Sequence, residues 1–416
     1  MLPGEVDVAI VGAGAAGVGA ARALAASGCS TLILEATGRV GGRARTETLA
    51  GAPLDLGCGW LHSAERNGWR AIAEASGIAV DRRRAAWGKQ FRDLGFTAEE
   101  QRAAGAAFAA FDQRLRDDPP ASDCAADALP PGGIWNAYLQ ALSGYINGVR
   151  LEQLSVADYL AYDDAASENN WRLPGGYGAL VAASLPPAVP LALAAPVQAI
   201  AIDDRSLSVQ TRRGAVRARA VIVTVSTGVL ATGGLRLPSA LDDHCQAAAN
   251  LPLGLADKLF LALDNADALP ADQHLIGDPR DPATGSYYLR PLGYSVVECF
   301  FGGEGAERVE REGLDGAAAF ANEQLRHLLG SGLRTRLLCG SAWGHDPAFL
   351  GSYSHALPGR RAARETLARN WDQRIWFAGE ATSPTDFSTA HGALASGEAA
   401  AQQVIEALRP APPPSA

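Results

Sequence analysis

The sequence lacks the usual marks of an exported, membrane-spanning or disulfide-bonded protein. Its six cysteines are scattered over 416 residues and form no C-x-x-C pair, which favours reduced, buried thiols in a cytoplasmic protein. No run of about 18 apolar residues occurs, and no basic segment followed by an apolar one precedes the first predicted strand. We therefore expect neither export nor a membrane span, and a cytoplasmic location.

An excess of positive charge is also absent. Lys and Arg number 36 against 45 Asp and Glu, which leaves a net charge of −9 and argues against nucleic acid as a partner. Such a surface would attract a cationic substrate, although solvated acidic side chains are the commoner cause of this balance. The length predicts two domains, which can be interleaved. No metal site is predicted, and the oligomeric state stays open.

The amino-terminal stretch has the pattern of a dinucleotide-binding unit. A β-rich apolar run at 6–11 predicts a buried parallel strand that stops at Gly12. Gly12, Gly14 and Gly17 form G-x-G-x-x-G, in which the glycines allow a tight turn, close approach of a diphosphate and close packing of helix on strand.

The continuation of this unit fits the same function. A helix should follow the glycine turn and end at Gly28, and Thr31 to Leu34 should form a second strand. Glu35 then stands at the carboxyl end of that strand, where a carboxylate can accept hydrogen bonds from ribose hydroxyls and disfavours NADP. A plain glycine-rich turn is the alternative interpretation.

Directly after this unit, the chain carries R-x-G-G-R. Gly41 and Gly42 leave backbone N–H groups accessible to an anion, and Arg39 and Arg43 offer donors for phosphate oxygens. Alone, this pattern also fits a surface turn with two solvated arginines. After a dinucleotide unit it favours FAD over NAD.

Two polar residues downstream are candidates for the active site. His62 follows a glycine-rich turn and is either a turn histidine with its partners satisfied or a group beside the cofactor. Lys258 lies inside an apolar strand around 255–263. It is either a snorkelling lysine near the strand end or, as we favour, a lysine that projects into a polar cavity.

Later segments suggest that the chain returns to the nucleotide domain. Short strands are predicted at 197–202, 207–211 and 215–225. The irregular stretch 343–359 is rich in aromatic residues and histidine, which suits a pocket wall. A last strand at 375–378 precedes a helix at 389–408, whose amino terminus favours an anion.

Seven blocks, in order along the chain, resemble the FAD-dependent amine oxidase family, which includes monoamine oxidases, polyamine oxidases and flavin-dependent lysine demethylases. They are the dinucleotide unit with Arg39 to Arg43, DLGCGWLH, WRLPGGYGAL, VIVTVSTGVL, DKLFLAL, WGHDPAFLGSYSHALPG and FAGEATSPTDFSTAHGALASG.

The resemblance implies the fold class: an α/β, Rossmann-like FAD-binding domain of the glutathione-reductase and amine-oxidase type, interleaved with an α+β substrate-binding domain. The expected FAD-binding segments are 1–75, 190–245 and 362–409, the expected substrate-binding segments are 76–189 and 246–361, and residues 410–416 are expected to be disordered.

The resemblance also assigns roles to residues. Lys258 would hold a water at flavin N5, Tyr353 would form one wall of the substrate site, and Trp343 and His62 would lie beside it. Glu35 would hold the adenosine ribose, Arg43 would lie near the pyrophosphate and flavin, and Glu380 would bind the ribityl-diphosphate part. The full set of predicted cofactor-binding residues is Gly12, Gly14, Ala15, Ala16, Gly17, Glu35, Ala36, Arg39, Gly41, Gly42, Arg43, Gly57, Gly59, Trp60, Val197, Trp343, Gly379, Glu380, Thr389, Ala390 and Ala393.

Two departures from the family pattern matter. Gly351-Ser352-Tyr353 stands where monoamine oxidases carry a cysteine joined to the flavin, so noncovalent FAD is expected. Thr389, grouped with the catalytic residues, stands where those enzymes place a tyrosine, which leaves one wall of an aromatic cage open.

The implied activity is oxidation of an amine C–N bond, with hydride transfer to FAD, O2 as the electron acceptor and H2O2 as a product. The substrate would be a polyamine or another primary or secondary amine. Asp163 and Asp164 could recognise a distal ammonium or could be solvated acidic residues. The rivals are a desaturase or porphyrinogen-type oxidase on the same fold, and a non-catalytic FAD-binding scaffold.

Overall fold

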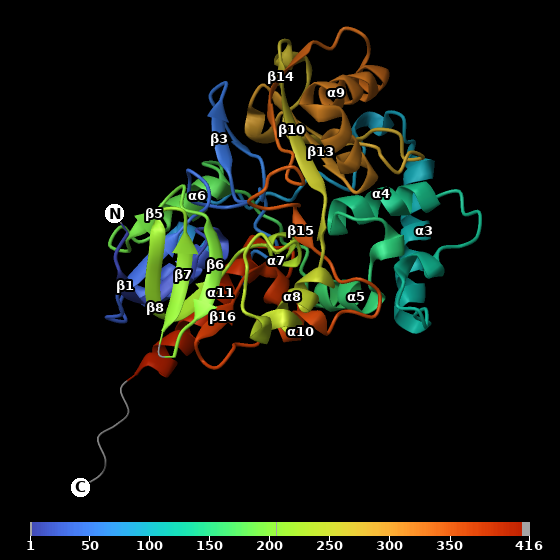
Figure 1. Cartoon of the computed structure of the whole chain (residues 1–416). Helices are drawn as coiled ribbons and strands as arrows, with labels where there is room; N and C mark the ends of the chain where they lie inside the picture. Colours follow the sequence, from blue (N-terminus) through green and yellow to red (C-terminus); the bar gives the residue numbers. More distant parts are fainter. Residues whose placement is uncertain (1, 205, 410–416) are drawn as a thin grey trace. The chain divides into compact units, whose positions relative to one another are not determined.

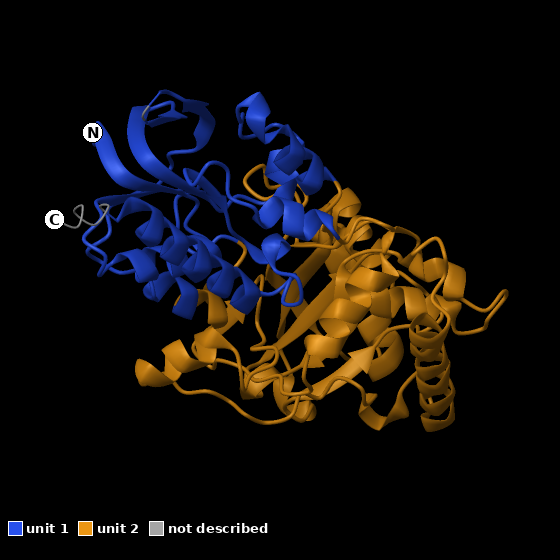
Figure 2. Cartoon of the chain, turned by 90° about the horizontal axis from the view of Figure 1, so that it is seen from below, with its two compact units in different colours: residues 1–42, 180–249, 362–416 blue, residues 43–179, 250–361 orange. Residues whose placement is uncertain are grey.

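The computed structural model describes residues 2–204 and 206–409 and divides into two compact units (Figure 2). Unit 1 comprises residues 1–42, 180–249 and 362–416, and unit 2 comprises residues 43–179 and 250–361. These bounds differ from the expected domain limits chiefly at 43–75, which falls in unit 2, and at 180–189, which falls in unit 1. The tail 410–416 lies outside the described residues.

Unit 1 is built on a seven-stranded sheet in the order β5-β2-β1-β8-β7-β6, with β16 also paired to β8 (Figure 1). The strands are β1 (Glu5–Val11), β2 (Thr31–Leu34), β5 (Leu191–Ala192), β6 (Val197–Ile202), β7 (Leu207–Thr211), β8 (Gly214–Val223) and β16 (Ile375–Phe377). β1, β2, β5, β8 and β16 pair in parallel, and β6, β7 and β8 form an antiparallel meander. The predicted strands of this unit are therefore present. The largest shift of a strand end is two residues, in β8, which ends at Val223 and was expected to end at residue 225.

The helices of unit 1 are α1 (Ala15–Leu24), α7 (Thr227–Ala231), α8 (Asp242–Ala249), α10 (Ala363–Ala368) and α11 (Ala390–Leu408), with 3₁₀ turns η4 (Ser239–Leu241) and η7 (Glu380–Thr382). Helices α1 and α11 pack on the parallel part of the sheet of unit 1, and α7 and α10 pack against α8. α1 and α11 approach so closely that a Cβ on Gly397 would lie 2.0 Å from the Ala16 carbonyl oxygen, and one on Gly19 2.6 Å from that of Leu394. Small residues on both helices are thus needed for this contact. The core beneath it includes Val8, Ile10 and Ile33.

Unit 2 is built on a five-stranded antiparallel sheet in the order β11-β12-β13-β10-β14. The strands are β10 (Ala256–Leu263), β11 (Gln273–Ile276), β12 (Ser286–Leu289), β13 (Val296–Gly302) and β14 (Thr335–Gly340), beside the hairpin β3 (Thr46–Leu49) and β4 (Ala52–Asp55) and the short pair β9 (Leu253–Gly254) and β15 (Tyr353–Ser354). Leu259, Leu261 and Phe301 point to one face of the sheet, where they pack with side chains of α9 (Glu304–Leu329) such as Phe320. Because side chains alternate along a strand, Lys258 and Phe260 belong to the opposite face.

The helices of unit 2 are α2 (Gly68–Ala75), α3 (Ala98–Asp117), α4 (Asn136–Asn147), α5 (Val156–Ala165) and α9 (Glu304–Leu329), with 3₁₀ turns η1 (Phe91–Asp93), η2 (Ala125–Ala128), η3 (Leu151–Gln153), η5 (Ala266–Ala268) and η6 (Pro291–Gly293); α6 (Tyr177–Ala183) begins at the end of the segment 43–179. Among the helices of unit 2, α4 and α9 pack on the five-stranded sheet and α3 packs against α5. α9 is interrupted at Gly313, where φ is 72°.

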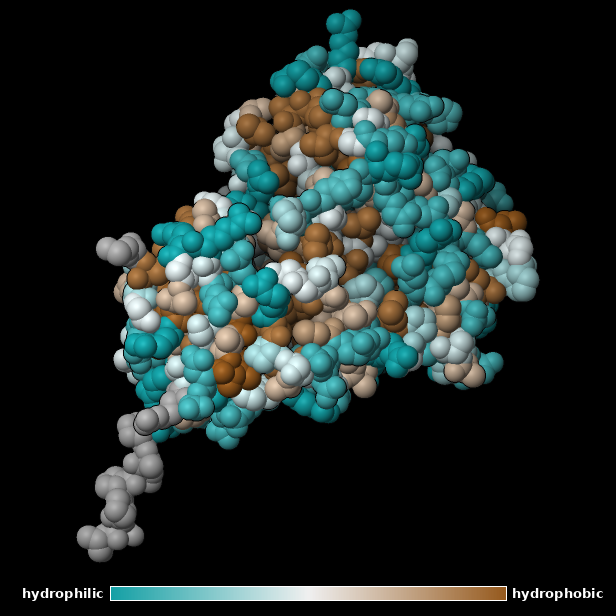
Figure 3. All heavy atoms as spheres, viewed as in Figure 1, coloured by the Kyte–Doolittle hydropathy of each residue, from teal (hydrophilic) through white to brown (hydrophobic). Residues whose placement is uncertain are grey.

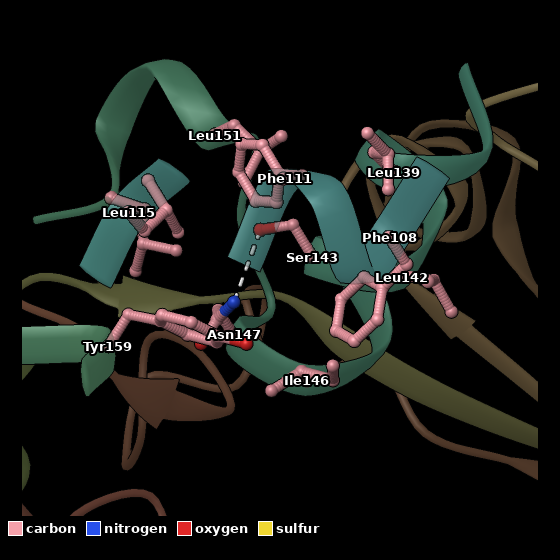
Figure 4. A pocket seen from close by; sticks show the side chains of 11 residues that line it. Phe108, Phe111, Leu115, Leu139, Leu142, Ser143, Ile146, Asn147, Leu151 and Tyr159 are labelled. Atoms are coloured by element: carbon pink, nitrogen blue, oxygen red, sulfur yellow. Dashed lines mark hydrogen bonds between the residues drawn. The ribbon is translucent and has the colours of Figure 1, made fainter. Parts of the chain in front are cut away.

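A hollow lies between α3, α4 and α5, lined by side chains such as Phe108, Phe111 and Ile146 (Figure 4). Its volume of about 10 Å³ is about the room that one water molecule needs. The hollow is therefore part of a loosely filled helical core and not a substrate site.

On the face drawn in Figure 3, hydrophobic residues are interspersed with hydrophilic ones. Large apolar side chains that stay exposed among the described residues are Trp87, Ile134 and Ile146. Across 2–204 and 206–409, no helix is long and apolar enough to cross a membrane. Within the same ranges, no group of His, Cys, Asp and Glu side chains could hold a metal ion.

Candidate active site

The two glycine segments predicted to hold the dinucleotide lie against each other in unit 1. The Gly41 N–H donates to the Ala13 carbonyl at 2.8 Å, and Gly14 and Gly41 form a parallel bridge. A Cβ on Gly42 would lie 3.0 Å from the Gly14 Cα, and one on Gly17 only 2.0 Å from the Gly12 carbonyl oxygen. Gly12 itself has a φ of +108°, which L side chains rarely adopt. Side chains are therefore excluded from the place where the backbone would approach a diphosphate.

Glu35 is buried at the end of β2 and faces this turn. Its Oε2 accepts the Ala13 N–H at 2.7 Å, and its Oε1 accepts the N–H and the hydroxyl of Thr37 at 2.8 and 2.7 Å. A carboxylate has about four acceptor positions. One of them is left for a ribose hydroxyl, so the glycine cradle and this acid fit the adenosine end of FAD.

The arginines of R-x-G-G-R go to different places. Arg39 lies in unit 1, where its Nη2 donates to the Gly42 carbonyl at 2.6 Å and braces the glycine pair. Arg43 lies in unit 2, where its Nη1 donates to the Ser352 carbonyl at 2.5 Å. Gly57 packs against the same residue, because a Cβ there would lie 1.7 Å from the Arg43 carbonyl oxygen.

The last predicted cofactor block surrounds the start of α11 in unit 1. Glu380 is 6% exposed and accepts the Ser388 N–H at 2.9 Å. The Thr389 hydroxyl caps the helix: it accepts the Gly392 N–H at 3.0 Å and donates to the Asp386 carbonyl at 2.6 Å. Thr389 therefore orients the amino terminus of the helix, whose first turn contains Ala390 and Ala393. The one proton of its hydroxyl is already donated, to the Asp386 carbonyl.

The remaining predicted cofactor residues of unit 1 lie on the same framework. Ala15 and Ala16 open α1, Ala36 follows Glu35, and Gly379 follows β16 with a φ of +150°. Val197 begins β6, paired with Thr211.

Lys258 lies on β10 in unit 2, and its ammonium has a carboxylate partner. Nζ is 2.8 Å from Glu298 Oε1 on β13, and the two side chains are 9% and 19% exposed. Gly59 leaves room for the ammonium, since a Cβ on it would lie 3.0 Å from Nζ. Burial raises the pKa of the nearby Asp55, whereas the positive charge of Lys258 acts to lower it. Lys258 is thus a buried, paired cation and not a snorkelling side chain.

Trp60 and His62 belong to an aromatic cluster on the same unit. The Trp60 and Trp87 rings are 4.4 Å apart, and the His62 ring stacks on Trp87 at 6.2 Å. His62 Nδ1 lies 2.6 Å from Asn170 Oδ1. The Arg172 guanidinium lies 5.0 Å from the ring centres of Trp60 and Tyr288.

Trp343 and Tyr353 are held by backbone contacts in unit 2. Trp343 is 5% exposed, and its backbone N–H donates to Asp257 Oδ1 at 3.1 Å. The Tyr353 hydroxyl donates to the Tyr145 carbonyl at 3.0 Å, and burial raises the pKa of this phenol. Both aromatic groups are therefore fixed and neutral.

Sequence reasoning missed Glu298, Trp87, Tyr288 and Arg172 as members of this region. Glu298 had a usable signal, because it is the one acid in the apolar run VVECFFG. Arg172 stands in the block WRLPGGYGAL, but nothing in the local sequence links it, Trp87 or Tyr288 to Trp60, because strand pairing and loop packing bring these residues together.

Comparison with known proteins identifies the family. Residues 15–405 match the model described as flavin containing amine oxidoreductase. The chain belongs to this family. It is 25% identical to polyamine oxidase 2 of Arabidopsis thaliana, over 95% of this chain and 87% of that protein. It is 27% identical to polyamine oxidase 4 of Oryza sativa subsp. japonica, over 95% and 88%.

Among solved structures, putrescine oxidase bound to putrescine superposes with a TM-score of 0.77 at 18% identity, covering 97% of this chain and 99% of that one. This likeness confirms the predicted fold class. The family membership confirms an FAD-dependent amine oxidoreductase.

Proposed function

We propose that the protein oxidises a C–N bond of a polyamine or of another primary or secondary amine and passes the electrons to O2. The amine loses two electrons and two protons to become an imine, and O2 takes up both to give H2O2. Water then hydrolyses the imine to an aldehyde and an amine or ammonia. Bound FAD supplies the hydride-accepting chemistry.

The observation that carries the proposal is the largely buried pair of Lys258 with Glu298. By resemblance, Lys258 corresponds to the lysine that holds a water at the flavin in this family. A cation at this place can hold a water and stabilise negative charge where apolar walls exclude bulk solvent. We expect the Tyr353, Trp343 and Trp60 rings to supply such walls; Trp343 is buried, and the Trp60 ring lies 4.4 Å from that of Trp87. Their low polarity favours the neutral form of the substrate amine, whose lone pair the imine requires.

A polyamine is the favoured substrate because two relatives that this chain matches over nearly their whole length are named polyamine oxidases. The net charge of −9 would also attract a polycation. Asp163 and Asp164 lend less support, since both form ion pairs with Arg116.

The test is a set of amines added anaerobically to the purified holoenzyme while the flavin absorbance is followed. We expect putrescine, spermidine or spermine to bleach the oxidised flavin, and air to restore it with formation of peroxide. Bleaching by a porphyrinogen or another large apolar substrate, with none by any amine, would instead favour the desaturase-like alternative. A flavin that no compound reduces would favour the scaffold.

We also propose that FAD is bound noncovalently. Ser352 lies in the segment where monoamine oxidases carry their flavin-linked cysteine. Its hydroxyl accepts the Ala256 N–H at 2.7 Å and donates to the Ala256 carbonyl at 2.9 Å. Acid precipitation of the holoenzyme is therefore expected to leave the flavin in the supernatant. Flavin that stays with the precipitate would contradict this.

A further inference from the structure

Two buried acidic side chains, Asp257 and Glu310, lie on the opposite side of β10 from the Lys258 ammonium. Asp257 is 0% exposed, and the Glu310 side chain, on α9, is 8% exposed. Both carboxylates hold the segment that follows β14. Asp257 Oδ1 accepts the Ser341 hydroxyl at 2.8 Å and the Trp343 N–H at 3.1 Å. Glu310 Oε1 accepts the Gly344 N–H at 2.5 Å.

This segment is tied in turn to Lys258. The Lys258 N–H donates to the Ser341 hydroxyl at 3.0 Å, and its carbonyl accepts the Ser341 N–H at 2.9 Å. One small network of hydrogen bonds thus fixes the backbones of both Trp343 and Lys258.

The network is incomplete unless it contains a proton. Among the described residues, Asp257 Oδ2 is buried and has no hydrogen-bond partner. Burial, the charge of Glu310 and contact with that side chain raise the pKa of Asp257 to about 7, although the bonds from Ser341 and Trp343 oppose the shift. A proton on Oδ2 could be donated to Glu310, so that each oxygen of Asp257 would take part in a hydrogen bond.

An exposed histidine lies beside the Glu310 carboxylate. His345 Nδ1 lies 2.8 Å from Glu310 Oε2, and the histidine side chain is 69% exposed. Burial and the nearby Asp257 charge raise the pKa of the Tyr353 phenol, which is therefore neutral. The Lys258 ammonium is paired with Glu298 on the other face of the sheet. His345 is therefore an exposed titratable side chain in contact with the Glu310 end of the pair.

We propose that Asp257 and Glu310 share one proton, that His345 connects this proton to solvent, and that the carboxyl pair positions Trp343 and Lys258 for catalysis. The positioning part rests on the proposed function, whereas the shared proton does not. Asp257 and Glu310 are positioning residues, because they act through the backbones of other residues.

The shared proton is tested by thermal unfolding of the holoenzyme at several pH values. Folded Asp257 keeps its proton up to about pH 7, whereas the unfolded carboxyl, with a pKa near 3.8, releases it earlier. The folded state then binds more protons, so this group makes the protein less stable as the pH rises through that interval. Asp257→Asn cannot titrate and carries a donor at the place of the proton.

The Tm of Asp257→Asn minus that of the wild type should therefore increase by roughly 4 °C between about pH 5 and about pH 8. Glu312→Gln is the matched control, because Glu312 lies on the same helix but is exposed and pairs with Arg308. Its Tm should follow the wild type. Parallel Tm curves for Asp257→Asn and the wild type would overturn the shared proton.

The positioning role is tested by anaerobic flavin reduction with a substrate found in the amine set. Asp257→Ala leaves the Ser341 hydroxyl and the Trp343 N–H without their acceptor, and it should slow reduction about 10-fold or more. Asp257→Asn keeps an acceptor oxygen and should restore most of that rate. Equal rates for Asp257→Ala and the wild type would overturn the positioning role. If no amine reduces the wild-type flavin, the proposed function fails, while the Tm measurement still decides the shared proton.

Discussion

Lys258→Met is expected to slow turnover of the amine about 100-fold while FAD stays bound. A positioned acid–base or charged group contributes about this much to a reaction. Methionine is similar in length and removes the ammonium, so the shape of the site should change little. The measurement is stopped-flow absorbance of the flavin, with reduction by the amine and reoxidation by O2 followed separately.

The Glu298 carboxylate complicates this variant, because it would lose its partner. Nζ and Oε1 lie only 2.8 Å apart at a largely buried site. Breaking a buried pair from one side leaves a costly charge, which could distort β13 and slow the reaction indirectly. The double variant Lys258→Met with Glu298→Gln removes both charges and relieves that distortion.

The two explanations give different rates. If the Lys258 amine takes part in the reaction, the double variant stays as slow as Lys258→Met. Recovery of the wild-type rate in the double variant would show that the ammonium is needed only to neutralise Glu298. Glu298→Gln alone should have a smaller effect than Lys258→Met, since it leaves the ammonium in place with an amide oxygen as acceptor.

Much of the cofactor framework could be predicted from local pattern. The run 6–11 became β1, the glycine turn opened α1, and Glu35 came to the end of β2, because tight turns and buried parallel strands impose residue types at fixed spacings. The helix predicted at 389–408 became α11, with Thr389 as its N-cap and not as its first helical residue.

The neighbours of Lys258 could not be predicted in this way. Glu298 is 40 positions further along the chain, as 298 − 258 = 40, and reaches Lys258 only through the register of β10 with β13. That register depends on the long-range pairing of two strands and not on any local spacing. The same holds for Asp257 and Glu310, which a strand and a helix bring together beneath a shared loop.

The domain limits illustrate a related difficulty. The dinucleotide motif continues without a break to Arg43, and nothing in the sequence after it marks a domain boundary. The expected FAD-binding segment therefore extended to residue 75. Contacts instead group residues from Arg43 onward with unit 2. Arg43 bonds to Ser352, and Asp55 accepts the backbone N–H groups of Tyr177 and Gly178 at 2.9 and 3.1 Å. Because the motif continues across the boundary between the two units, the local sequence does not show where unit 1 ends and unit 2 begins.

Gly17→Ala is expected to abolish retention of FAD and to lower the Tm clearly. The new Cβ would lie 2.0 Å from the Gly12 carbonyl oxygen and 3.0 Å from the carbonyl carbon, both of which are backbone atoms that cannot rotate away. The start of α1 must then move from the end of β1, at a cost of about 1–3 kcal/mol, and the diphosphate cradle opens. The measurement is the ratio of flavin to protein absorbance after gel filtration, with circular dichroism to confirm that the chain still folds.

Gly38→Ala is the control in the same block. Gly38 has no atom within 4 Å of its ideal Cβ and no positive φ, so its variant should keep both FAD and stability. The contrast between two glycines replaced by the same residue separates close packing at the turn from a general loss of flexibility. A Gly17→Ala protein that folds and keeps its flavin as firmly as Gly38→Ala would mean that the turn between β1 and α1 does not hold the cofactor. The FAD site of unit 1 would then have to be built on Glu380 and the start of α11.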